Sequence, residues 1–155
     1  MKIVTRDLLR QVTEQAQASP RLRKNHNLHS NDNSSCHRLL NAIEPLSYIC
    51  PHRHLDPEKD EAFILLTGSL GVVTFSEGGE VAETVVLSHN SGNLAVNVPH
   101  AVFHTAVSLE PGTVFFEAKA GPYLPVTEDE KASWAPPEGD GKAASYLEQL
   151  RNLFH

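Results

Sequence analysis

The chain has 155 residues, of which 40% are hydrophobic and 21% charged, and its formal net charge is −6. This length and composition suit one folded domain over residues 1–155 and exclude a disordered chain. The acidic charge excludes a nucleic-acid partner, because phosphate contacts need clustered Lys and Arg. The apolar runs are shorter than the roughly 20 residues of a membrane helix, and the N-terminus lacks the apolar stretch of a signal peptide. We therefore expect a cytoplasmic protein without membrane contacts.

The N-terminal segment has the pattern of an amphipathic helix. Apolar residues recur at helical spacing from Leu8 to Ala16, and Ser19-Pro20 is a stop signal. The pattern predicts a helix over residues 4–18. Residues 20–35 are polar and rich in Asn, Ser and His, which is typical of a loop.

Short β-type runs separated by turn signals fill residues 36–121. Eight segments have the composition of strands: 37–43, 46–54, 61–67, 70–76, 81–88, 94–98, 101–109 and 113–120. Many short strands at this spacing are typical of a sandwich or a barrel. The sequence therefore predicts a mainly β protein with its barrel core over residues 36–121.

Residues 122–155 form a tail in which a Pro- and Gly-rich stretch precedes a predicted helix over residues 143–154. An apolar stripe runs along this helix through Tyr146, Leu147, Leu150, Leu153 and Phe154. The stripe either packs on the barrel or builds a twofold interface. Because exposed sheet edges also favour pairing, we expect a homodimer.

The tripeptide His52-Arg53-His54 is the strongest chemical signal in the chain. On a strand, alternate side chains share a face, so His52 and His54 point the same way and Arg53 points away. Glu61 and His104 would add two donors from other strands. Three imidazoles and one carboxylate suit a borderline divalent metal and leave coordination positions open. We predict one divalent ion (Zn, Fe, Mn or Ni), whose identity these ligand types do not decide.

These residues match two motifs of the cupin superfamily, which the chain resembles. The first motif resembles His52-x-His54, Glu61 and Gly68, and the second resembles Gly92, Pro99 and His104. The resemblance implies a cupin barrel (a double-stranded β-helix or jelly roll) with an N-terminal helix and a short C-terminal helix. It also implies that His52, His54, Glu61 and His104 hold one metal.

The chain departs from the motifs at several positions. Leu46 and Ala101 stand where the motifs usually have glycine. The gap from His54 to Glu61 is longer than usual, which leaves Glu58 and Asp60 as alternatives to Glu61. Glu61 is favoured because it begins an apolar strand and keeps the usual six-residue distance to Gly68.

Further blocks resemble the WbuC-type cupin metalloproteins, small bacterial proteins of which some are encoded among O-antigen polysaccharide genes. The resemblance covers about residues 24–138 and includes Asn25-His26-Asn27-Leu28-His29 and Gly121-Pro122-Tyr123. It implies a loop at the barrel mouth, in which His26 and His29 contact substrate or hydrogen-bond a ligand histidine. The alternative is that both histidines are simply exposed.

Three more side chains have two interpretations each, and a fourth is expected to have no role. Tyr123 either closes over the barrel opening, as a substrate contact, or packs as an ordinary aromatic. Lys119 either binds substrate inside the cavity or forms an ion pair on the outside. Cys50 is either a thiol close to the ligands or a small buried residue. His37 is expected to be an isolated histidine without a role.

Three functions follow from a metal with open positions. The first is a metal-dependent isomerase or epimerase, in which the ion acts as a Lewis acid on a small polar metabolite. The resemblance favours a sugar or sugar nucleotide in surface polysaccharide (O-antigen, lipopolysaccharide) biosynthesis. The others are a metal-dependent dioxygenase or other oxidoreductase, and a non-catalytic small-molecule binding module. The catalytic residues stay unassigned, and an isomerase would need a base such as His26, His29 or Tyr123.

Overall fold

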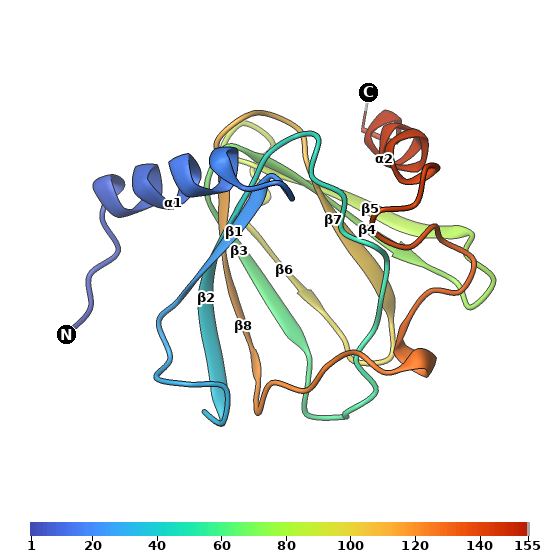
Figure 1. The fold of residues 1–155 in the computed structure, drawn as a ribbon, viewed down its shortest axis with the longest axis horizontal. Coiled ribbons are helices and arrows are strands. Elements are labelled where there is room, and N and C mark those ends of the chain that lie inside the picture. The colour runs from blue at the N-terminus through green and yellow to red at the C-terminus, as the bar shows by residue number, and fades with distance from the viewer. Residues whose placement is uncertain (155) are drawn as a thin grey trace.

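Residues 1–154, which the computed structural model describes, form two antiparallel β-sheets with a helix against each (Figure 1). The elements in chain order are α1 (Arg6–Ala18), β1 (Arg23–Asn27), β2 (Cys36–Ile43), β3 (Glu61–Thr67), β4 (Ser69–Phe75), β5 (Val81–Ser88), β6 (Ala95–Val98), β7 (Phe103–Ser108), β8 (Thr113–Ala120), the 3-10 helix η1 (Glu128–Glu130) and α2 (Ala143–Asn152). Among the helices of this range, none has the length and apolarity needed to cross a bilayer.

The two sheets divide the strands unequally. One sheet has the order β1-β2-β8-β3-β6 and the other has the order β5-β4-β7. The chain changes sheet between β3 and β4, and β8 returns to lie between β2 and β3. This arrangement is the jelly roll of the cupin fold, so the predicted fold class is confirmed.

The space between the sheets holds an apolar cluster next to a polar cavity. Because side chains alternate along a strand, Phe63 and Leu65 of β3 face inward, as do Leu70 and Val72 of β4. The whole interior cluster comprises Ile43, Phe63, Leu65, Leu70, Val72, Leu87, Val98, Ala106 and Phe115. Burial of these side chains contributes most of the stabilisation of the barrel, at roughly 1.5–3 kcal/mol for each large one.

Helix α1 lies on the outer face of the five-stranded sheet (Figure 1). The Thr5 side chain caps the helix by accepting a hydrogen bond from Leu8 N at 3.2 Å. Val12 and Ala16 are buried in one cluster with Leu40 of β2. The helix predicted over residues 4–18 is confirmed, and its first turn begins two residues later than predicted.

Helix α2 lies outside the three-stranded sheet. Leu147 and Leu150 belong to the same buried cluster as Val73 of β4 and Val107 of β7. The apolar stripe of the predicted helix is therefore used within the chain. Leu153, which was included in that stripe, is largely exposed.

The predictions for two segments are wrong. Residues 20–35 contain strand β1, which pairs with β2 from Arg23↔Ile43 to Asn27↔Leu39. Its sequence is wholly polar, so only the distant pairing partner makes it a strand. Residues 46–54 form no named strand, because Leu46 lies in a turn and the backbone bonds around His52 go partly to β7 and partly to the tail.

Candidate metal centre

An extended segment carries the first two candidate ligands. His52 and His104 exchange backbone hydrogen bonds, with N···O distances of 3.1 and 2.8 Å. One residue further on, Arg53 N donates to Glu130 O at 2.9 Å. The segment therefore lies between β7 and the tail, and its alternation keeps His52 and His54 on the same side.

Arg53 points away from the two histidines, as alternation requires. Its guanidinium lies over the Phe103 ring, 4.3 Å from the centroid, and Nη1 donates to Glu77 at 2.6 Å. These contacts tie the segment to the outside of the barrel. Arg53 is a structural residue rather than a donor to the site.

Glu61 begins β3, and it joins the histidines despite the lengthened gap. Its Oε1 lies 2.9 Å from His54 Nε2, and its Oε2 lies 2.8 Å from His104 Nε2. Asp60 points elsewhere and accepts from the backbone N of His100 at 2.8 Å, while Glu58 is exposed. Of the three acidic residues considered from the sequence, the structure brings Glu61 to the site.

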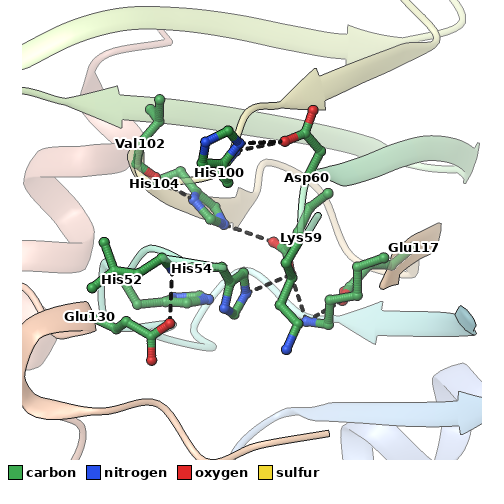
Figure 2. Close-up of polar contacts among 12 residues, drawn as sticks. His52, His54, Lys59, Asp60, His100, Val102, His104, Glu117 and Glu130 are labelled. Carbon is green, nitrogen blue, oxygen red and sulfur yellow. Dashed lines mark hydrogen bonds and ion pairs between the residues drawn. The ribbon is translucent and has the colours of Figure 1, made fainter. Parts of the chain in front are cut away.

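The side chains of His52, His54 and His104 converge (Figure 2). Donor atoms of His52, His54 and Glu61 all lie within 4.8 Å of one another. The His104 ring centroid lies 4.8 Å from that of His52. The four residues singled out from the sequence thus come together, from the 52–54 segment, β3 and β7.

Backbone carbonyls fix the orientation of two of these rings. Nδ1 of His52 lies 3.1 Å from Cys50 O, and Nδ1 of His104 lies 2.9 Å from Val102 O. Because a carbonyl can only accept, both Nδ1 atoms carry a proton. In a neutral ring this leaves Nε2 with its lone pair directed at the site, which is the arrangement of a metal-binding histidine.

The charges of the site also suit a cation. Burial, followed by repulsion from His104, lowers the pKa of His52 to about 4, so the ring is neutral at pH 7. Burial alone would raise the pKa of Glu61, but its close polar contacts with the His104 and His54 rings and the charge of Lys119 outweigh burial. The pKa of Glu61 is held well below its usual value, and the carboxylate is ionised.

Lys119 holds the Glu61 carboxylate from the other side. Its Nζ lies 2.5 Å from Glu61 Oε1 and 2.7 Å from Glu117 Oε1. Asn41 donates to the second oxygen of Glu117 at 2.6 Å, and the Glu117 side chain reaches this group from β8 (Figure 2). Burial lowers the pKa of Lys119, but the two carboxylates outweigh burial and raise it overall.

The donor set fits a divalent metal. With metal–ligand bonds of about 2.1 Å, two ligand atoms at a right angle lie about 3.0 Å apart, close to the Nε2–oxygen distances around Glu61. His104 already bonds a carbonyl through Nδ1, so a second proton or a cation must occupy the space between Nε2 and Glu61. Nitrogen and oxygen donors of this kind accept Zn, Fe, Mn and Ni alike.

A cavity of about 490 Å³ opens onto this cluster. His52, Glu61 and His104 form part of its wall. The other described residues that line it are Arg23, Asn25, Asn27, His29, Asp32, His37, Leu39, Asn41, Ala42, Ile43, Ile49, Phe63, Thr105, Ala106, Phe115, Glu117, Lys119 and Tyr123. The lining is largely polar, which suits a small polar ligand rather than an apolar one.

The predicted substrate contacts divide into two groups. His29, Lys119 and Tyr123 line the cavity, and Lys119 is therefore on the inside of the barrel. His26 lies on β1 between cavity-lining Asn25 and Asn27 and is not among the described lining residues. Alternation along the strand explains the difference.

His37 is the main cavity residue that the sequence interpretation missed. It was expected to be an isolated histidine, but it is buried and lines the cavity. The available signal was the period of two in β2, where His37, Leu39 and Asn41 all face the cavity. Of the two interpretations of Cys50, the structure favours the small packed residue, because Cys50 is partly buried against the cluster under α2.

Comparison with known proteins supports the fold. The chain is similar to KdgF from a Halomonas species, at 19% identity over 68% of this chain and 84% of that one, with a TM-score of 0.52. It is similar to TT1209 from Thermus thermophilus, at 18% identity over 77% and 97% of the two chains, with a TM-score of 0.53. It is also similar to SPY1581, a conserved protein of unknown function from Streptococcus pyogenes, at 10% identity over 79% and 90%, with a TM-score of 0.53. Identities this low show the fold alone.

Sequence comparison gives a family but no characterised relative. None of the curated proteins matches the chain. The resemblance to WbuC-type proteins stays a prediction. A sequence family described as a domain of unknown function, DUF6016, matches residues 4–87, which is more than half of the chain, and the chain therefore belongs to that family.

Proposed function

We propose that this protein binds one divalent metal ion through His52, His54, Glu61 and His104 and acts on a small polar metabolite in the adjoining cavity. The observation that carries the proposal is the Glu61 carboxylate, which is held between two imidazole Nε2 atoms at 2.8 and 2.9 Å where the cavity meets the cluster. The metal, when bound, would supply a Lewis acid that polarises a carbonyl or hydroxyl oxygen of the substrate. An isomerase or epimerase is the reaction class that we infer.

The residues around the cavity support this class. Lys119 and Glu117 fix the Glu61 carboxylate, so that its oxygens keep one orientation. An isomerase also needs a group that takes and returns a proton, and His29 and Tyr123 line the same cavity. The resemblance to WbuC-type proteins supports a sugar or sugar nucleotide of surface polysaccharide biosynthesis as the substrate.

Elemental analysis of the purified protein tests the metal site. We expect about one equivalent of a divalent metal in the natural chain and loss of that metal in the His52→Ala, His104→Ala double variant. His100→Ala is the matched control, because His100 is bonded to Asp60 on the surface and should leave the metal content unchanged. Absence of metal from the natural chain, together with no uptake on titration with Zn, Fe, Mn or Ni, would refute the proposal.

The identity of the metal then separates the reaction classes. Zinc that is lost in the double variant supports Lewis-acid chemistry or a binding role. A redox-active metal with substrate-dependent oxygen consumption would replace the isomerase by a dioxygenase. Ligand binding without turnover of any bound metabolite would leave a binding module.

A further inference from the structure

A second pair of histidines lies in the cavity wall, apart from the metal centre. The rings of His29 and His37 are stacked, with their centroids 4.1 Å apart and 19° between their planes. Both residues are only 5% exposed, yet both line the cavity. Neither bonds to a candidate metal ligand among the described residues.

Backbone contacts decide which nitrogen of His29 carries the proton. The Arg38 carbonyl already accepts from Leu28 N at 2.8 Å. Nδ1 of His29 lies 3.1 Å from both the N–H and the carbonyl oxygen of Arg38. Because the carbonyl already has a donor and the N–H needs an acceptor, we assign Nδ1 as the acceptor, and the neutral ring carries its proton on Nε2.

His37 has the same tautomer, but the backbone occupies its other nitrogen. Its Nε2 lies 3.1 Å from the carbonyl of Asp32, which can only accept, so Nε2 carries the proton. A Cβ at Gly121 would come within 2.8 Å of this ring edge, which shows that the Nε2 side is packed against the backbone. Nδ1 is left as the acceptor. The stacked pair therefore offers one N–H donor and one nitrogen acceptor.

Strand register connects this pair to the metal centre. His37 of β2 lies opposite Lys119 of β8, and Lys119 lies opposite Glu61 of β3. Residues that are opposite each other share a face, so the three form a row along the cavity wall. With strands about 4.8 Å apart, the ends of the row are roughly 10 Å apart. One ligand of about the length of a hexose can therefore touch both ends.

The charges in the cavity argue against an anionic group at the histidine end. Lys119 is paired with Glu61 and Glu117, and Arg23 donates to Glu138 at 2.8 Å. Lys119 and Arg23 are the Lys and Arg residues among the described lining residues, and both side chains are paired with carboxylates. Asp32, also in the lining, adds a negative charge to the cavity wall.

We propose that His29 and His37 form a second binding subsite, which takes the hydroxyl groups of an uncharged, polyhydroxylated end of the substrate. A hydroxyl both donates and accepts, which matches the one donor and one acceptor of the pair. Asn25 and Asn27 line the same side of the cavity and add amide groups of the same character. The inference deepens the proposed function, because it assumes that the metal centre and the subsite serve one ligand.

Histidine-selective NMR on the full chain tests the subsite. The 15N-histidine protein is titrated with D-glucose, D-gluconate and D-glucose 6-phosphate, which share a carbon skeleton and differ in charge. We expect D-glucose to shift the ring signals of His29 and His37. We expect its dissociation constant to rise about tenfold in His37→Leu and in His29→Gln, since each loses a hydrogen bond. His26→Gln on the same strand is the matched control and should bind like the natural chain.

Other outcomes overturn the subsite in a way that is distinct from failure of the metal centre. Binding of either anionic sugar more than tenfold tighter than D-glucose, with shifts at His29 and His37, would show an anion site instead. Zinc added to the same sample reports on His52, His54 and His104. If zinc shifts the signals of His52, His54 and His104 while D-glucose leaves those of His29 and His37 unchanged, the subsite is rejected. The metal centre is then retained. A glucose response without a response to Zn, Fe, Mn or Ni supports the subsite and rejects the metal centre.

Discussion

His52 and His104 form an isolated antiparallel bridge in which each backbone N–H donates to the carbonyl of the other residue. This bridge fixes the two ligand-bearing backbones directly, so the spacing of the two rings does not depend on side-chain packing alone. His54 extends the same arrangement, because its carbonyl accepts from Ala101 N at 2.6 Å. The candidate donors are therefore positioned before any ion binds.

A bound metal should stabilise this fold, because it links the 52–54 segment to β3 and β7. Zinc at about 100 times its dissociation constant adds about 2.7 kcal/mol to the free energy of unfolding. For a chain of this size, this raises the melting temperature by roughly 5–10 °C, as measured by calorimetry with and without chelator. His104→Gln should lose the response and His100→Gln should keep it. Equal responses of these two variants would contradict the assignment of His104.

Lys119 should be important for stability as well as for the site. Lys119→Met leaves Glu61 and Glu117 without their shared cation in a buried environment, which costs about 3 kcal/mol. The double variant Lys119→Met, Glu117→Gln removes one of the two carboxylates and should recover part of this loss. Urea denaturation of the natural chain, of Lys119→Met, of Glu117→Gln and of the double variant measures the coupling. Additive effects of the two substitutions would show that Lys119 and Glu117 do not interact.

The barrel strands were predictable because their signal is local. Residues 61–67 are a short apolar run that ends at the turn signal Gly68-Ser69, and β3 has those same bounds. Strand β1 was not predictable, because its five polar residues are in a strand only through pairing with β2. The strand expected over residues 46–54 failed for the converse reason. It contains Pro51, which has no N–H to donate, and the bonds around it go to two different elements.

The site was predictable only as far as residue types and spacing reach. His52, His54, Glu61 and His104 form a recognisable donor set, so their convergence was expected. The partnership of His37 with His29 depends on the register between β1, β2 and β8, which no short motif encodes. The side of the barrel on which Lys119 lies was also not predictable, because it depends on which face of β8 lines the cavity.

The outer face of β3 and β6 is the surface on which we place the expected homodimer contact. Ile64 of β3 is 42% exposed and lies opposite the exposed Ala95 of β6, outside the part of the sheet that α1 covers. Pairing of two copies would bury them. Light scattering should show a dimer for the natural chain and a single chain for Ile64→Lys. Val81→Lys on β5 is the control, and a natural chain that runs as a monomer would rule out the dimer.

Ala101 has a backbone strain that glycine would relieve. Its φ of 62° lies in the left-handed region, which costs a residue with a Cβ about 1–2 kcal/mol. Ala101→Gly should therefore stabilise the chain by roughly 0.5–1 kcal/mol, after the greater chain entropy of unfolded glycine is subtracted. Gly112→Ala is the reciprocal control, since Gly112 has φ 75° and room for a Cβ, and it should destabilise by about 1 kcal/mol. Denaturation curves that show Ala101→Gly to be the less stable chain would contradict this account.

Glu130 should give stability that depends on pH. Burial opposes its ionisation, but hydrogen bonds from the backbone N–H groups of Thr127 and Leu55 outweigh burial and lower its pKa from 4.5 to about 2. A carboxylate whose pKa is depressed by folding stabilises the folded chain fully above its unfolded pKa, near 4.5, and this contribution is lost as the pH falls towards 2.

Replacement of Glu130 by Gln separates this contribution from general acid unfolding. The natural chain should be more stable than Glu130→Gln by roughly 1 kcal/mol at pH 6, a small value because solvent screens this group. The difference should shrink steadily between about pH 4.5 and pH 2. Glu128→Gln, in the same turn, removes only an exposed contact with Lys131 and should show a smaller difference over this range. A difference between the natural chain and Glu130→Gln that stays constant from pH 6 to pH 3 would mean that the Glu130 charge does not hold the His54–Leu55 backbone in place.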